Sequence, residues 1–82
     1  MNELINIGQY TFFEKGAIAA ILDFEINTSI FEAKMNAGLG FYINLGLGDV
    51  KYRSLLLLKN GEMYASPLSI ERLVERFNSK SN

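Results

Sequence analysis

The sequence predicts a small α+β domain in which a mixed or antiparallel sheet is accompanied by two helices. The chain has 82 residues, which is the length of one domain. Short β-prone segments separated by glycines fill much of it, an Asn-Gly hairpin follows, and an amphipathic helical pattern lies near the C-terminus. We therefore expect a single domain over residues 1–82, with a frayed polar tail over residues 78–82.

The N-terminal part of the chain predicts two or three strands. Residues 4–7 alternate apolar and polar side chains and are followed by a glycine, which is typical of a short strand. Residues 10–13 are β-prone and either extend this strand or begin a second one. Lys15-Gly16 is a turn candidate. The nearly continuous apolar run 17–22 then predicts a strand that is buried on both faces.

A short helix is expected after this buried strand. The Asn-Thr-Ser segment 27–29 opens it, and Ser29 with Glu32 three residues later matches a capping box. Gly38 is a natural stop for the helix. Five apolar side chains make up its expected buried side: Ile30, Phe31, Ala33, Met35 and Ala37.

Two strands and a loop are expected in the middle of the chain. Residues 41–45 are aromatic and β-branched and predict a strand, and the glycine-containing segment 46–49 follows as a flexible loop. The strand over residues 53–58 contains four consecutive leucines. A strand that is apolar on both faces belongs in the middle of a covered sheet.

The dipeptide Asn60-Gly61 is the clearest turn signal in the sequence. It favours a type I′ turn, because both central residues of that turn need a positive φ. The turn joins the leucine strand to a returning strand over residues 63–66. Lys59 and Glu62 would then face each other across the two strands with opposite charges.

An amphipathic helix is expected after this hairpin. Pro67 ends the hairpin, and Ser69 is a good helix N-cap. Leu68 and Leu73 lie on either side of the cap at the spacing of a hydrophobic staple. The buried face follows the i, i+3, i+4, i+7 pattern and comprises Ile70, Leu73, Val74 and Phe77.

The composition favours self-association. A chain of this length buries about 60–65% of its unfolded surface, so a lone monomer is only marginally stable. The sequence has no cysteine for disulfides and no histidine, which makes a structural zinc site unexpected. Oligomerisation is the remaining common remedy, and the apolar content of 49% agrees with it.

Charge and hydropathy narrow the location and the class of partner. The net charge is −1, which argues against strong DNA binding by a monomer but leaves room for a basic stripe built by repetition in an oligomer. The first residues lack a basic region followed by a long apolar run, so we expect no signal peptide. The apolar runs are too short to span a membrane. We therefore expect a cytoplasmic protein without a membrane partner.

The residue types do not predict an enzyme. Without histidine or cysteine there is no imidazole base and no thiolate nucleophile. Asp23 and Glu25 lie two positions apart after a strand and could share a face for acid–base work or cation binding, although a solvated strand end is the simpler interpretation. The glycines at 38, 40, 46 and 48 match no phosphate-loop motif. We expect no catalytic residue, cofactor, metal ion or small-molecule substrate.

Two groups of basic residues are candidates for anion contacts. Lys51 and Arg53 flank Tyr52, and such a cluster could hold phosphate oxygens. The alternative is a charged strand edge that blocks unwanted pairing. Arg72 and Arg76 lie one turn apart on the last helix, but their alternation with glutamates favours a solvated face.

Four segments, in their order along the chain, carry a resemblance to a known family. They are Ile-Asn-Ile-Gly at 5–8, Ala-Ile-Ala-Ala-Ile-Leu-Asp at 17–23, Arg-Ser-Leu-Leu-Leu-Leu at 53–58 and, most strongly, Glu-Met-Tyr-Ala-Ser-Pro-Leu-Ser at 62–69. With the helix that follows, they resemble the extracellular-matrix regulatory protein family of bacteria, RemA and RemB. The Ser-Pro-Leu-Ser motif is closer to the RemB branch. The resemblance covers nearly the whole chain and is weakest over residues 28–45.

The resemblance implies a small α/β subunit that assembles into a homo-oligomeric ring. It also implies a transcriptional regulator of biofilm-matrix genes that binds double-stranded DNA. Many weak phosphate contacts, one set per subunit, would add up through multivalency. In this hypothesis Lys51 and Arg53 contact phosphates, and Lys15 is a third candidate.

The sequence departs from the RemA pattern at basic positions. RemA-type proteins carry an arginine just before the first apolar strand, where this chain has Ala17, with Lys15 as the nearest cation. They also carry paired basic residues after the loop glycine, where this chain has Val50 and Lys51. Arg53 does match the arginine that opens the leucine strand. The alternative hypothesis is therefore a homo-oligomeric interaction or scaffold protein that does not bind DNA.

Overall fold

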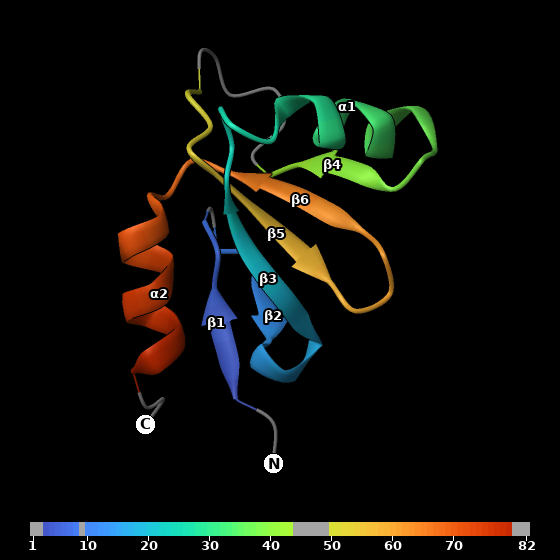
Figure 1. Ribbon diagram of the computed structural model, residues 1–82. Coiled ribbons are helices and arrows are strands. Elements are labelled where there is room, and N and C mark those ends of the chain that lie inside the picture. The colour runs from blue at the N-terminus through green and yellow to red at the C-terminus, as the bar shows by residue number, and fades with distance from the viewer. Residues whose placement is uncertain (1–2, 9, 44–49, 80–82) are drawn as a thin grey trace.

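The computed structural model describes residues 3–8, 10–43 and 50–79. These residues form an α+β fold with two helices and two sheets, which confirms the expected fold class. A short 3₁₀ helix over Lys15–Ala17 precedes β3. The elements follow one another as β1 (Leu4–Asn6), β2 (Phe12–Glu14), β3 (Ile18–Asp23), α1 (Thr28–Asn36), β4 (Gly40–Tyr42), β5 (Ser54–Leu58), β6 (Met63–Ser66) and α2 (Ile70–Asn78) (Figure 1).

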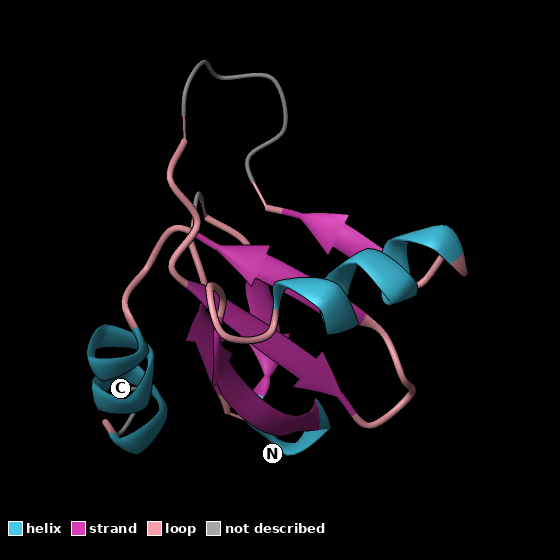
Figure 2. Cartoon of the chain, turned by 45° about the horizontal axis from the view of Figure 1, so that its top comes forward, coloured by secondary structure: helices cyan, strands magenta, loops and turns pink. Residues whose placement is uncertain are grey.

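Four strands form the central sheet in the order β3-β5-β6-β4. The first three are antiparallel neighbours, whereas β4 runs parallel to β6. β1 and β2 form a separate antiparallel hairpin. Figure 1 shows α2 beside this hairpin and α1 beside β4, and the turned view in Figure 2 shows the two helices at opposite ends of the sheet. The sheet is therefore mixed, as expected.

The leucine strand β5 lies inside the sheet and is covered on both faces, as the sequence predicts. Leu56 packs with residues of the β1–β2 hairpin and α2, and its neighbour Leu55 packs with Phe31 of α1. This alternation follows from the two-residue period of a strand. The buried members are Ile5, Ile7, Ile43, Leu56 and Leu73 on the hairpin side, and Phe31, Leu55, Met63 and Ala65 on the α1 side.

The prediction that the apolar run 17–22 is a doubly buried strand is wrong. β3 is an edge strand of the central sheet, and none of its residues is fully buried. Its register shifts between Ile18 and Ala20, and Ala19 is exposed. A run of apolar residues does not distinguish a central strand from an edge strand, because sheet position depends on residues far away in the chain.

The predicted capping and buried side of α1 are also wrong. The helix begins at Thr28 after Asn27, whose side chain donates to the Asp23 carbonyl and does not cap the helix, so Ser29 lies inside the helix. Of the five expected core side chains only Phe31 is buried. The reason is geometric: at 100° per residue Phe31 and Met35 share one side of the helix, and the other three lie on another side. Those three are Ile30, Ala33 and Ala37, and all are exposed.

The β5–β6 turn differs from the predicted type I′ geometry. The Gly61 N–H donates to the Leu58 carbonyl at 3.0 Å, so Lys59 and Asn60 occupy the centre of the turn. Gly61 has a φ of 95°, whereas Asn60 has no positive φ. This is a three-residue loop in which glycine takes the left-handed position after the turn. Glu62 consequently pairs with Leu58 and not with Lys59.

The start of α2 confirms the sequence prediction. The Ser69 hydroxyl oxygen accepts a hydrogen bond from the Arg72 N–H at 3.1 Å. Leu73 is fully buried, and Leu68 packs against the same cluster, as a hydrophobic staple requires. Val74 is 41% exposed, so the buried face is narrower than expected. Phe77 lies partly buried against the same cluster.

Several predicted boundaries fall at the limits of the described residues. The strand expected over 41–45 is observed as β4, Gly40–Tyr42, and is followed by the buried Ile43. The rest of that segment and the glycine loop 46–49 lie outside the described residues. In the predicted frayed tail, Asn78 is still helical, and residues 80–82 lie outside the described part of the chain.

Candidate functional site

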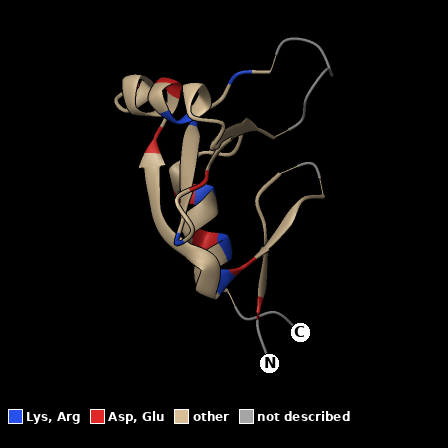
Figure 3. Cartoon of the chain, turned by 90° about the vertical axis from the view of Figure 1, so that its right-hand side faces the viewer, with Lys and Arg blue, Asp and Glu red and all other residues tan. Residues whose placement is uncertain are grey.

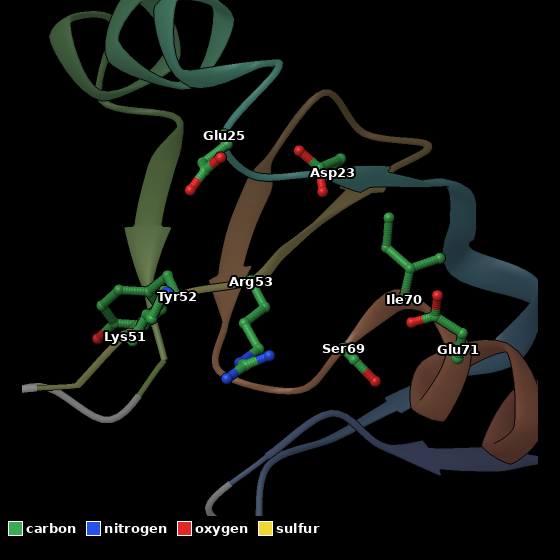
Figure 4. A pocket seen from close by; sticks show the side chains of 8 residues that line it. All are labelled: Asp23, Glu25, Lys51, Tyr52, Arg53, Ser69, Ile70 and Glu71. Atoms are coloured by element: carbon green, nitrogen blue, oxygen red, sulfur yellow. The ribbon is translucent and has the colours of Figure 1, made fainter.

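A hollow of about 260 Å³ lies where β3 ends, β5 begins and α2 starts. We call it the mixed-charge hollow, because its charged residues carry both signs (Figure 4). It brings the predicted phosphate contacts Lys51 and Arg53 together with the paired carboxylates. It is lined by Asp23, Glu25, Lys51, Tyr52, Arg53, Ser69, Ile70 and Glu71.

The backbone fixes the position of Arg53 in this hollow. The Arg53 N–H donates to the Ser66 carbonyl at 2.9 Å, and the Arg53 carbonyl accepts from the Phe24 N–H at 3.2 Å. The neighbouring Ser54 is fully buried and donates its hydroxyl to the Leu68 carbonyl at 2.8 Å. Arg53 is therefore anchored to the ends of β3 and β6, and its neighbour to the segment that leads into α2.

The charged side chains of the hollow do not pair with one another. Among the described residues the salt bridge is between Lys15 and Glu3, outside this hollow. The Asp23 Oδ2 accepts the Ile26 N–H at 2.9 Å, which caps the turn after β3. The other four charged side chains make no hydrogen bond within the described part of the chain, namely Glu25, Lys51, Arg53 and Glu71.

Tyr52 forms a fixed aromatic wall beside these charges. Its hydroxyl donates to the Ile43 carbonyl at 2.7 Å, and its ring lies 4.9 Å from that of Tyr42 and 6.1 Å from that of Phe24, between centroids. Burial raises the pKa of Tyr52 above its ordinary value, and the nearby Tyr42 adds to the rise. The Tyr52 phenol is therefore neutral at pH 7 and serves as a hydrogen-bond donor to the backbone.

A second hollow of about 250 Å³ shares Arg53 and Ser69 with the first. We call it the arginine hollow, because Arg53, which precedes β5, and Arg72 of α2 both line it. The remaining lining residues are Pro67 and Leu68. Sequence reasoning assigned Arg72 to a solvated face. The sequence feature that could have indicated this role is the position of Arg72 three residues after the Ser69 cap, which places Arg72 in the first turn of α2.

Arg76, one turn later on α2, has a different environment. Its Nη1 donates to the Asn6 carbonyl at 2.9 Å and so ties the helix to β1. Arg72 makes no such side-chain bond in the described structure. The structure therefore separates two arginines that look equivalent in the sequence: Arg76 stabilises the fold, and Arg72 is available at the arginine hollow.

Lys15, the third predicted phosphate contact, lies away from both hollows. Its Nζ is 2.9 Å from Glu3 Oε1 and donates to the Ser79 carbonyl at 2.6 Å. The same ammonium group lies 5.8 Å from the centroid of the Phe77 ring. The side chain is only 12% exposed, and it joins the N-terminal segment to the end of α2. The structure does not bring Lys15 together with Lys51 and Arg53.

Charges of both signs are interspersed over the molecule. Figure 3 shows acidic and basic positions next to one another on the same elements. Within residues 3–8, 10–43 and 50–79 there is no group of three His, Cys, Asp or Glu side chains arranged to hold a metal ion. The described helices do not include one that is long and apolar enough to cross a membrane.

Comparison of the sequence with protein-family models gives no match, and comparison with curated proteins gives no significant match. The resemblance to RemA and RemB therefore rests on the four segments quoted above. The geometry of the two hollows provides an independent basis for a functional proposal. Its main features are the accessible arginines Arg53 and Arg72 and the carboxylates that adjoin the first of them.

Proposed function

We propose that this protein is a homo-oligomeric, DNA-binding transcriptional regulator of the RemA/RemB kind, cytoplasmic and without enzymatic activity. The observation that carries the proposal is the meeting of Arg53 and Arg72 at the arginine hollow. One belongs to the segment before β5 and the other to α2. Two arginines that line one hollow are suited to the tetrahedral oxygens of a backbone phosphate.

The surroundings of the two arginines support a phosphate contact. The hollow lies at the N-terminal end of α2, where the helix dipole favours an anion. Lys51 adds a third cation in the neighbouring mixed-charge hollow. Contacts of this kind read the DNA backbone and not the base sequence, so one subunit supplies weak, salt-sensitive binding. Repetition of the same contacts in an oligomer would raise the affinity through multivalency.

An exposed apolar stripe on α1 supports the homo-oligomeric part of the proposal. Ile30 is 49% exposed, and Ala33 and the C-cap residue Ala37 continue the stripe at helical spacing. Ile26, in the turn before α1, is 83% exposed and adds to this apolar surface. A small monomer gains no stability from apolar side chains left in water, whereas a second copy that covers them gains by burial. Ring assembly itself remains an implication of the family resemblance.

The proposal is tested by binding to long duplex DNA and by the mass in solution. At low salt the wild-type protein should retard a duplex of a few hundred base pairs, and binding should weaken steeply as salt rises. Multi-angle light scattering should give a mass several times that of one chain. A protein that stays monomeric and leaves the duplex free at low salt would refute both parts of the proposal.

A second candidate is a homo-oligomeric scaffold that does not bind DNA. It is favoured by Asp23, Glu25 and Glu71, which line the mixed-charge hollow beside Arg53 and repel phosphate. In this case the double variant Lys51→Glu/Arg53→Glu should keep both its assembly and its cellular role. Loss of the cellular role with an intact oligomer would count against the scaffold and for the regulator.

A further inference from the structure

The charges of the mixed-charge hollow are separated across it. Asp23 and Glu25 belong to the end of β3 and the turn that follows, and Figure 4 shows both carboxylates on one side of the hollow. The guanidinium group of Arg53 points to the opposite side, toward Ser69. The hollow thus has Asp23 and Glu25 on one side and Arg53 on the other, with the third lining carboxylate, Glu71, next to Ile70. Asp23 and Glu25 form no ion pair with Arg53.

We infer that the mixed-charge hollow binds a zwitterionic small molecule of amino-acid size. The ammonium group of such a ligand would lie against Asp23 and Glu25, and its carboxylate would lie against Arg53. A simple anion would be repelled by the three lining carboxylates, and a simple cation by Arg53 and Lys51. A ligand that carries both charges at separate ends gains from both ends of the hollow.

The size and walls of the hollow agree with this ligand class. Its volume of about 260 Å³ is below the range typical of drug-sized ligands and fits a molecule with a handful of heavy atoms. Tyr52, held by its bond to the Ile43 carbonyl, supplies an aromatic wall for the short apolar chain between the two charges. Ile70 adds apolar lining from α2.

One carboxylate and the backbone of the arginine are held in place before a ligand arrives. The Asp23 carboxylate is oriented by the Ile26 N–H, which leaves its second oxygen free among the described residues. The backbone of Arg53 is bonded on both sides, to Ser66 and to Phe24. Binding therefore has to order the side chains of Glu25 and Arg53, whereas the Asp23 carboxylate is already oriented, which lowers part of the entropic cost of capturing a small ligand.

The inference is tested with three probes of matched chain length. They are ε-aminocaproate, which carries both charges, caproate, which carries only the carboxylate, and hexylamine, which carries only the ammonium group. Titration of ¹⁵N-labelled protein should give saturable amide shifts at residues 51–53 and 69–71 with ε-aminocaproate. Each single-charge probe should bind about tenfold or more weakly. Equal binding of all three probes, or no saturable shift with ε-aminocaproate, would overturn the inference.

Three variants locate the binding and keep the result independent of folding. Arg53→Gln and the double variant Asp23→Asn/Glu25→Gln should each weaken ε-aminocaproate binding about tenfold. Asparagine retains the oxygen that accepts the Ile26 N–H. The control Lys59→Gln removes an exposed cation at the opposite end of β5 and should leave binding unchanged. Unperturbed spectra of the free variants establish that each one folds, and wild-type affinity in Arg53→Gln would contradict the assignment.

The zwitterion site does not depend on DNA binding, because the titration contains no DNA. The double variant Asp23→Asn/Glu25→Gln separates the two ideas. It removes negative charge beside Arg53 and should strengthen DNA binding while it weakens ε-aminocaproate binding. If this variant binds DNA more weakly than the wild type does, only the DNA-binding proposal is contradicted. If its affinity for ε-aminocaproate is unchanged, only the proposed ligand site is contradicted.

Discussion

The two helices have the same length but are attached to the sheet in different ways. Each spans nine residues, α1 over Thr28–Asn36 and α2 over Ile70–Asn78. α2 has a side-chain cap and buries Leu73 in the cluster beneath the β1–β2 hairpin. α1 has no side-chain cap, and its one buried residue is Phe31, whereas α2 adds the partly buried Phe77 to its one buried residue, Leu73. The comparison teaches that α2 is specified by its own amphipathic sequence, whereas α1 is held by one aromatic anchor.

Polar contacts repeat this contrast. α2 and the residue that follows it are bonded to distant segments, through Arg76 to the Asn6 carbonyl and through the Ser79 carbonyl to Lys15. The described side-chain bond from α1 to another element is made by Lys34, whose Nζ donates to the Gly61 carbonyl at 2.7 Å. The outward apolar stripe of α1 is left uncovered, which is the feature that our proposal assigns to self-association.

Truncation of the two anchors tests the comparison with the largest expected effect. Phe31→Ala should lower the free energy of unfolding by about 3–5 kcal/mol and Leu73→Ala by about 2–5 kcal/mol, because each leaves a cavity. Denaturant titration measures both losses. Amide exchange should then rise mainly in α1 for the first variant and throughout the domain for the second. A loss below about 1 kcal/mol for Phe31→Ala would mean that other contacts hold α1.

The close approach of α1 to β4 gives the next largest effect. A Cβ on Gly40 would lie 2.7 Å from the backbone nitrogen of Met35, so Gly40→Ala should lower the free energy of unfolding by about 1–3 kcal/mol. The matched control is Gly16→Ala, where a Cβ would meet no atom within 4 Å. That change should be neutral or stabilising by about 0.4–1 kcal/mol. The midpoints of thermal unfolding of the two variants measure this difference. Equal midpoints would contradict the close packing of α1 against Gly40.

The two serines near the helix starts test the capping difference. Ser69→Ala removes the acceptor for the Arg72 N–H and should cost about 1 kcal/mol. Ser29→Ala lies inside α1 and should change stability by less than about 0.5 kcal/mol. Both variants are compared by urea denaturation. A larger loss at Ser29 would restore the capping box that the sequence suggested.

The apolar stripe gives the smallest effect on stability and the clearest effect on assembly. Ile26→Gln/Ile30→Gln should change the free energy of unfolding of the monomer by about 0.5 kcal/mol or less, because both side chains are exposed. It should reduce the mass measured by light scattering. Glu32→Gln, an exposed position on the same helix, is the control and should leave the mass unchanged. An unchanged oligomer in the double variant would direct the search to another surface.

Features that depend on neighbouring residues could be predicted from the sequence. The Ser69 cap and the Leu68 and Leu73 staple are both observed. The central position of the leucine strand is also observed, but the same apolar pattern gave the wrong position for β3. The position of the turn at Asn60-Gly61 was predicted correctly, but the predicted type I′ geometry was wrong. Its type is set by the register of β5 and β6, in which Leu57 pairs with Met63. Register is a property of two strands and their packing, and the dipeptide alone does not determine it.

Features that depend on distant parts of the chain were not predictable. Lys51, Arg53, Asp23 and Glu25 were each singled out, but as separate groups. The β3–β5 register places Asp23 opposite Ser54, which brings the carboxylates and the cations to one hollow. Arg72 was missed, because the alternation of charges on α2 does not reveal which arginine the fold uses elsewhere.

The salt dependence of DNA binding tests the central claim most directly. The logarithm of the affinity for a long duplex should be measured against the logarithm of the salt concentration for wild type, Arg72→Gln and Lys59→Gln. Loss of one phosphate contact lowers the slope by about 1 for each engaged subunit. We expect a lower slope for Arg72→Gln and an unchanged slope for Lys59→Gln. Equal slopes for all three proteins, or no binding at low salt, would contradict the assignment of the arginine hollow to phosphate.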